Sequence, residues 1–117
     1  WYINSMEYEV RLLDPANEFI DSLPGKMQAK VYHTIDMLKE FGYQLKEPWS
    51  KTLRNAEGMK ELRVKLASNI CRLFYFHHKD KLYVVTSGYT KKRDKTDKRE
   101  IERALRLMHE VLREEPQ

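Results

Sequence analysis

The chain has 117 residues, of which 41% are hydrophobic and 34% are charged, and its formal net charge is +4. This size suits one soluble domain with one packed core and excludes a two-domain organisation. No apolar run approaches the roughly 20 residues of a membrane span, and no secretory signal is seen, so we expect no membrane contact. The single cysteine, Cys71, excludes an internal disulfide and is typical of a reducing cytosol. Residues 1–5 precede Met6, and we treat them as an added segment or an alternative start.

The positive charge is concentrated in residues 91–99. This stretch holds six of the 22 basic residues and two of the 18 acidic ones, so the remainder of the chain is balanced in charge. A run of this kind is either a solvated loop or an electrostatic footprint for phosphate. The run alone leaves both interpretations open.

The N-terminal part of the chain predicts a strand followed by two helices. Apolar and charged residues alternate over residues 8–12, which indicates a strand with one buried face. Asp14 and Pro15 then match a helix N-cap and a first helical position, and apolar residues at helical spacing follow them. The same spacing predicts a second helix over residues 24–42, with a glycine as its C-terminal cap.

The middle of the chain predicts a loop and then strands. Residues 43–58 are irregular, and we expect a loop there with a short edge strand near residues 49–53. Alternation and short connectors predict three further antiparallel strands: residues 61–66, 70–77 and 82–89. In the second of these strands, the residues that point to each face are apolar, apart from Arg72. This is expected of a central strand that is covered on both faces.

An apolar stripe over residues 101–112 predicts a last helix, and Asp97 and Glu100 are spaced as a capping box at its start. The order of elements is therefore strand, two helices, strands, helix. We expect one α+β domain over residues 1–117, in which two N-terminal helices and a C-terminal helix pack on a mostly antiparallel, twisted sheet of four to five strands.

Several familiar catalytic motifs are missing from the sequence. Its four glycines form neither a phosphate loop nor a dinucleotide-binding loop. His77 and His78 have no third ligand nearby in sequence, so we expect no metal site, and we expect no cofactor. Cys71 lies among apolar residues, which favours a buried, inert thiol over a nucleophile.

Three cations lie on predicted strands. Alternation places Arg63 and Lys65 on the same face of their strand. Arg72 lies in the most apolar strand of the chain, where an unpaired charge would be costly. Two interpretations of Arg72 remain open: a buried ion pair with a carboxylate such as Glu61, or an anion-binding arginine in a groove.

Cations in this arrangement suit a phosphodiester, and suit its more negative transition state better. Lys91 and Lys92 follow the last strand and would lie at the rim of the same groove. RNA supplies its own 2′-hydroxyl nucleophile, so its cleavage needs a base, an acid and fixed positive charge. A lysine whose pKa is lowered by neighbouring cations can serve as the base. These residues therefore favour an RNA-cleaving site.

Four segments in a fixed order carry a resemblance to a known family: Glu-Leu-Arg at 61–63, Arg-Leu-Phe-Tyr at 72–75, Tyr-Thr-Lys-Lys at 89–92 and Glu-Ile-Glu-Arg-Ala at 100–104. The chain resembles the RelE/ParE superfamily of bacterial toxins, and within it the phage-derived, HigB-like branch. The resemblance implies a cytoplasmic toxin of a type II toxin–antitoxin system. Such a toxin is a metal-independent mRNA interferase that cleaves translated mRNA in the ribosomal A site. Its partners are mRNA, the ribosome and a cognate antitoxin, which we expect to be a helix-turn-helix protein.

The resemblance also implies roles for individual residues. Lys65 is the expected general base, Arg63 and Arg72 stabilise the phosphate, and Lys92 binds phosphate or assists the leaving group. We expect four further residues to bind RNA: Lys51, Lys91, Arg93 and Lys95. Many RelE-like nucleases carry a tyrosine or histidine near the start of the last helix or at the end of the chain, but residues 96–98 of this chain read Thr-Asp-Lys.

Two other functions stay open. ParE-like members of the same superfamily inhibit DNA gyrase by binding, and they generally lack the strand cations. A basic module could instead bind phosphates through residues 91–99 without any chemistry. The nuclease and the module both predict salt-sensitive RNA binding, but only the nuclease predicts new RNA ends.

Overall fold

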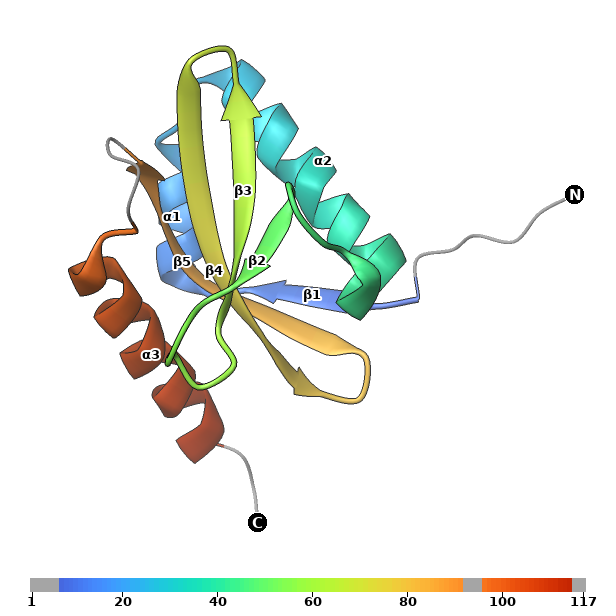
Figure 1. Ribbon diagram of the computed structural model, residues 1–117, viewed down its shortest axis with the longest axis vertical. Helices are drawn as coiled ribbons and strands as arrows, with labels where there is room; N and C mark the ends of the chain where they lie inside the picture. The colour runs from blue at the N-terminus through green and yellow to red at the C-terminus, as the bar shows by residue number, and fades with distance from the viewer. Residues whose placement is uncertain (1–6, 92–95, 115–117) are drawn as a thin grey trace, which may run out of the picture.

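The computed structural model describes residues 7–91 and 96–114, and Figure 1 shows how their elements are arranged. The strands are β1 (Glu9–Leu12), β2 (Ser50–Thr52), β3 (Lys60–Leu66), β4 (Asn69–Lys79) and β5 (Leu82–Lys91). The helices are α1 (Asp14–Asp21), α2 (Gly25–Phe41) and α3 (Lys98–Arg113), and a 3-10 turn, η1, spans Gly42–Gln44. The α+β architecture predicted from the sequence, with three helices on a sheet of four to five strands, is confirmed.

The sheet has the order β1-β5-β4-β3-β2. β1 pairs with β5 in parallel, and the other neighbouring strands are antiparallel, as the short connectors predicted. β4 lies in the centre of the sheet, which agrees with the apolar residues on both of its faces. β2 is short and pairs only with the first part of β3, from Lys60 to Leu62. The outer edge of β3 beyond Leu62 therefore has no described strand beside it.

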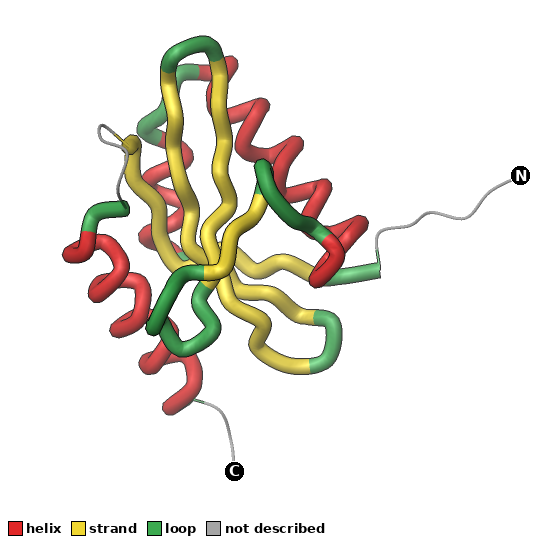
Figure 2. The backbone as a smooth tube through the Cα atoms, viewed as in Figure 1, coloured by secondary structure: helices red, strands yellow, loops and turns green. Residues whose placement is uncertain are grey.

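The two faces of the sheet are covered by different helices. α1 and α2 pack on one face, where Ile20, Val31 and Leu38 meet sheet residues such as Leu62 and Leu73. α3 packs on the other face, where the buried residues include Phe74, Phe76, Val84, Ala104 and Met108. Figure 2 shows α3 apart from the two N-terminal helices, and the tip of the β3–β4 hairpin extends beyond the N-terminal end of α3. None of the described helices is long and apolar enough to cross a membrane.

Two details of the elements differ from the sequence prediction. α1 begins at Asp14 itself, with Leu13 at the N-cap and no side-chain cap, so the N-cap assigned to Asp14 was wrong by one residue. The reason is tertiary: the Leu13 N–H donates to Val85 O at 3.0 Å, which keeps Leu13 extended up to the start of the helix. β5 also extends to Lys91, so this lysine lies within the strand and not after it.

Gly42 caps α2 in a conformation that side chains disfavour, with φ 55° and ψ −126°. A Cβ at this position would lie 2.4 Å from the Tyr8 ring. We expect Gly42→Ala to lower the free energy of unfolding by about 1–3 kcal/mol, because backbone strain and a steric clash act together. Urea unfolding measures this change. Gly25→Ala is the control, because its Cβ would meet nothing within 4 Å and alanine favours the helix. Equal losses in both variants would contradict the interpretation.

Candidate nucleic-acid interface

The register of β3, β4 and β5 brings four of the candidate cations to one face of the sheet. Residues that pair across a ladder point to the same side. Arg63 on β3 pairs with Arg72 on β4. Ile70, two positions before Arg72, pairs with Lys65 on one side and with Lys91 on the other. Because Phe74 follows Arg72 by two positions and belongs to the α3 core, these cations lie on the α3 face. The shared face predicted for Arg63 and Lys65 is confirmed.

Two of these cations have no partner for their charge among the residues that the structure describes. Arg63 is half-buried and Lys65 is exposed. Within the ranges 7–91 and 96–114 the structure gives neither side chain a hydrogen-bond or ion-pair partner. Lys51 is exposed and pairs with Glu61, which precedes Arg63 by two positions on β3. Lys51 therefore lies on the same face of the sheet as Arg63 and Lys65. Positive charge therefore accumulates on this part of the sheet, and such a surface attracts anions.

Arg72 is buried, and only 3% of it is exposed. Its Nη1 donates to Oε1 of Glu61, whose side chain is fully buried, and to Thr96 Oγ1 at 3.1 Å. Thr96 Oγ1 in turn donates to Glu61 Oε2 at 3.3 Å. Of the two interpretations that the sequence left open, the structure shows the buried ion pair. Arg72 Nε is buried without a hydrogen-bond partner in the described structure, and a direct contact between Arg72 and phosphate stays a prediction.

The same polar cluster holds the start of α3. Asp97 is the N-cap, and its Oδ1 accepts from the Arg99 N–H at 2.9 Å. The Asp97 N–H donates to the hydroxyl of Tyr89 at 3.1 Å, so the reciprocal bond of the predicted capping box is not formed. Oε1 of Glu100 is buried without a partner among the described residues. A tertiary contact from β5 has thus taken the place that the local motif assigned to Glu100.

Tyr89 is fixed at both ends, because its ring stacks on Phe74 with centroids 5.7 Å apart and its hydroxyl binds the Asp97 N–H. Burial raises the pKa of Tyr89 above its ordinary value. We expect Tyr89→Phe to lower the free energy of unfolding by about 0.5–1.5 kcal/mol, because the Asp97 N–H loses its acceptor. Chemical unfolding measures this loss. Tyr43→Phe is the control, since Tyr43 is 66% exposed and should tolerate the change. A loss of the same size in both variants would show that the bond contributes nothing specific.

Three of the predicted site residues lie outside the described residues: Lys92, Arg93 and Lys95. Their roles stay predictions. Two described residues, Lys91 and Thr96, border this segment. Both lie at the cation face, by which we mean the α3 face of the sheet around Arg63, Lys65 and Arg72. Lys91 is placed there by its pairing with β4, and Thr96 by its bond to Arg72.

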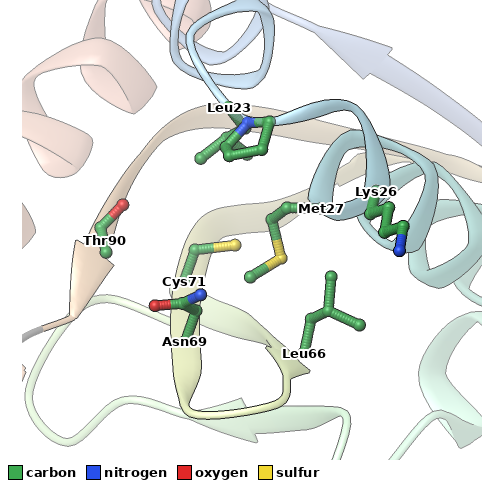
Figure 3. A pocket seen from close by; sticks show the side chains of 8 residues that line it. Leu23, Lys26, Met27, Leu66, Asn69, Cys71 and Thr90 are labelled. Atoms are coloured by element: carbon green, nitrogen blue, oxygen red, sulfur yellow. The ribbon is translucent and has the colours of Figure 1, made fainter.

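The opposite face of the sheet holds an apolar pocket of about 340 Å³, which Figure 3 shows. The side chains of Met27 and Cys71 lie in it with their sulfur atoms turned toward each other. Cys71 is fully buried, as predicted from the sequence, and burial raises the pKa of its thiol to about 11, which disfavours the reactive thiolate. Tyr75 is buried on the same side, bound to Ser50 at 2.5 Å, and therefore lies away from the cations. Within the described ranges, no group of three His, Cys, Asp or Glu residues could hold a metal ion.

A second pocket, of about 390 Å³, lies at the edge of β3, where the Arg63 N–H donates to Trp49 O at 2.8 Å. We call it the edge pocket; its lining includes Lys30 and His33 from α2, Trp49 from the segment before β2, and Arg63 and Lys65 from β3. Sequence reasoning missed this pocket. Its residues come from three segments, and no local pattern indicates that they meet.

The sheet order and the two helical layers together define a RelE-like α+β fold. Solved structures share it. The archaeal RelE–RelB complex from Pyrococcus horikoshii OT3 is 20% identical, with a TM-score of 0.58, over 75% of this chain and 99% of that chain. The intact E. coli RelBE toxin–antitoxin complex is 18% identical, with a TM-score of 0.56, over 74% and 99% of the two chains. The Mycobacterium tuberculosis RelBE2 complex is 24% identical, with a TM-score of 0.50, over 73% and 99%.

Residues 18–109 match the family described as Phage derived protein Gp49-like (DUF891), and the chain belongs to this family. No curated protein matches its sequence. The resemblance to phage-derived members of the RelE/ParE superfamily is therefore confirmed, by the family match and by the fold.

Proposed function

We propose that the chain is the toxin of a toxin–antitoxin pair and that it is an endoribonuclease that cleaves translated mRNA in the ribosomal A site. The observation that carries this proposal is the pair Arg63 and Lys65, two cations without an ion-pair partner in the described structure, on one face of β3. Solved relatives of the same fold are complexes of RelE with RelB, which supports an antitoxin as a partner.

The proposed reaction is a transfer within the RNA. Lys65 removes the proton of the 2′-hydroxyl, and the resulting oxygen attacks the adjacent phosphorus. The bond from phosphorus to the 5′ oxygen breaks, the leaving oxygen takes up a proton, and a 2′,3′-cyclic phosphate and a 5′-hydroxyl remain. Arg63 stabilises the extra negative charge of the pentacovalent transition state. Lys92 binds the phosphate or assists the leaving group, and the scheme requires no metal or cofactor.

Arg72 has a different role in this proposal. Its guanidinium is engaged by Glu61 and Thr96, so it acts as a positioning residue that fixes β3 relative to the start of α3. Lys51 and Lys91 contact the RNA backbone on either side, together with Arg93 and Lys95. Such phosphate contacts make binding weaker as salt rises. The toxin would act in the cytoplasm, where translated mRNA and an antitoxin with a helix-turn-helix domain are both present.

Two other functions are weaker candidates. A ParE-like inhibitor of DNA gyrase needs no unpaired cations on β3, and a basic module that only binds phosphates needs no site on the sheet. Arg63 and Lys65 on one face therefore favour the nuclease over both alternatives.

Induction of the chain in bacteria, followed by mapping of mRNA 5′ ends, tests the proposal. We expect growth arrest with new 5′ ends that are in phase with codons, and we expect Lys65→Ala to abolish both. Lys81→Ala is the matched control, because Lys81 is 63% exposed and lies in the turn between β4 and β5. Growth arrest without new 5′ ends, accompanied by loss of DNA supercoiling activity, would favour the gyrase inhibitor instead.

A further inference from the structure

The edge pocket contains both cations that we assign to RNA cleavage. Arg63 and Lys65 contribute to its lining and also lie on the α3 face of the sheet. Both placements are possible because β2 begins opposite Leu62 and only the Trp49 carbonyl, which accepts from the Arg63 N–H at 2.8 Å, continues the pairing; beyond Arg63 no described strand lies beside β3. A strand of RNA with its phosphate at Arg63 and Lys65 therefore has this pocket directly beside it.

The other side chains of the edge pocket suit a nucleotide. Lys30 and His33 are exposed on α2, and neither side chain has a hydrogen-bond or ion-pair partner in the part of the chain that the structure describes. Trp49 is 45% exposed, although burial of its indole would be favourable. Figure 1 shows the segment between α2 and β2 running back beside α2 before it enters β2. An exposed aromatic ring among cations is the arrangement with which proteins bind single-stranded nucleic acids, because bases stack on the ring and phosphates meet the cations.

We propose that the edge pocket binds a nucleotide of the RNA substrate next to the cleaved bond, and that the base of this nucleotide stacks on Trp49. This inference rests on the proposed nuclease function. Lys30 neutralises a phosphate that flanks the bound base, while Arg63 holds the phosphate that reacts and Lys65 faces the 2′-hydroxyl. Trp49 is then a substrate-positioning residue, and the edge pocket contributes to which nucleotide is placed beside the cleaved bond.

The deciding measurement is kcat/KM for cleavage of mRNA on programmed ribosomes by the full chain. We expect Trp49→Ala to lower kcat/KM by about 5- to 150-fold, the range that corresponds to the loss of one stacked base. Trp49→Phe keeps an aromatic ring and should retain most of the activity. Tyr43→Ala is the matched control, because Tyr43 is an exposed aromatic residue outside the edge pocket. Thermal unfolding of each variant checks that the fold is intact.

A second measurement identifies the chemistry of the ligand. With Trp1→Phe, Trp49 is the sole tryptophan, and we expect a single-stranded 2′-O-methyl RNA oligonucleotide to quench its fluorescence. An oligoglutamate peptide of equal length is the comparison, since an acidic protein segment would also meet the cations. Quenching by the peptide and not by RNA would overturn the inference.

The cleavage assay separates this inference from the function on which it rests. A wild-type chain that leaves mRNA intact overturns the proposed nuclease, and the inference with it. A wild-type chain that cleaves mRNA while Trp49→Ala cleaves it equally well overturns the inference alone, and the nuclease stands.

Discussion

Replacement of Glu61 by alanine is expected to lower the free energy of unfolding by about 3–5 kcal/mol, the usual cost of removing one partner of a buried ion pair. Glu61 is fully buried and Arg72 is 3% exposed, so water cannot compensate the guanidinium that remains. Thr96 would be the one hydrogen-bond partner left to Arg72 Nη1 in the described structure. Urea unfolding measures the loss directly.

Two further variants show that the loss comes from the unpaired charge. The double variant Glu61→Leu with Arg72→Met replaces the pair by apolar residues and should recover most of the stability, because buried pairs are often no better than well-packed apolar groups. Glu57→Ala is the surface control: Glu57 binds His109 at 2.9 Å, but both are largely exposed, so a change within about 1 kcal/mol is expected. A double variant as unstable as Glu61→Ala would contradict the argument.

The buried pair also explains how the cation face can exist. Arg63 and Arg72 lie directly opposite each other across β3 and β4, and like charges in this position repel. Glu61 compensates Arg72 from within the sheet. Arg63 and Lys65 are thereby left without a carboxylate partner in the described structure, and a phosphate can take that place.

Local alternation was enough to predict much of the fold and part of the site. Polar and apolar residues alternate along β3, and this pattern alone placed Arg63 and Lys65 on one face, as the register confirms. The need to compensate Arg72 also followed from the sequence, because the surrounding strand is apolar. Periods of two and 3.6 residues depend only on neighbouring positions, so they can be read without knowledge of the fold.

Features that depend on distant segments could not be predicted in the same way. Asp97 and Glu100 match a capping box, yet the hydroxyl of Tyr89 takes the N–H that the box assigns to Glu100. Trp49 reads as part of an edge strand, and nothing near it in sequence shows that α2 and β3 complete a pocket around it. In each case the deciding partner comes from another element of the fold.

Substitution of either cation on β3 is expected to abolish most of the proposed cleavage. We expect Arg63→Ala and Lys65→Ala each to lower kcat by about 10²- to 10³-fold, because the first removes a group that stabilises transition-state charge and the second removes the proposed general base. The free energy of unfolding should change little, because neither side chain has a hydrogen-bond or ion-pair partner in the described structure. Single-turnover cleavage of mRNA on programmed ribosomes measures the rate, and Lys81→Ala serves as the exposed-lysine control.

Lys65→Arg distinguishes a general base from a fixed charge at this position. A guanidinium stays protonated at any pH at which the protein is folded, so arginine can supply charge but cannot remove the proton of the 2′-hydroxyl. If Lys65 is the base, Lys65→Arg should be as slow as Lys65→Ala. Recovery of activity in Lys65→Arg would instead assign Lys65 to charge stabilisation and require another base. Because both cations would act on one transition state, the double variant should lose less than the product of the two single losses.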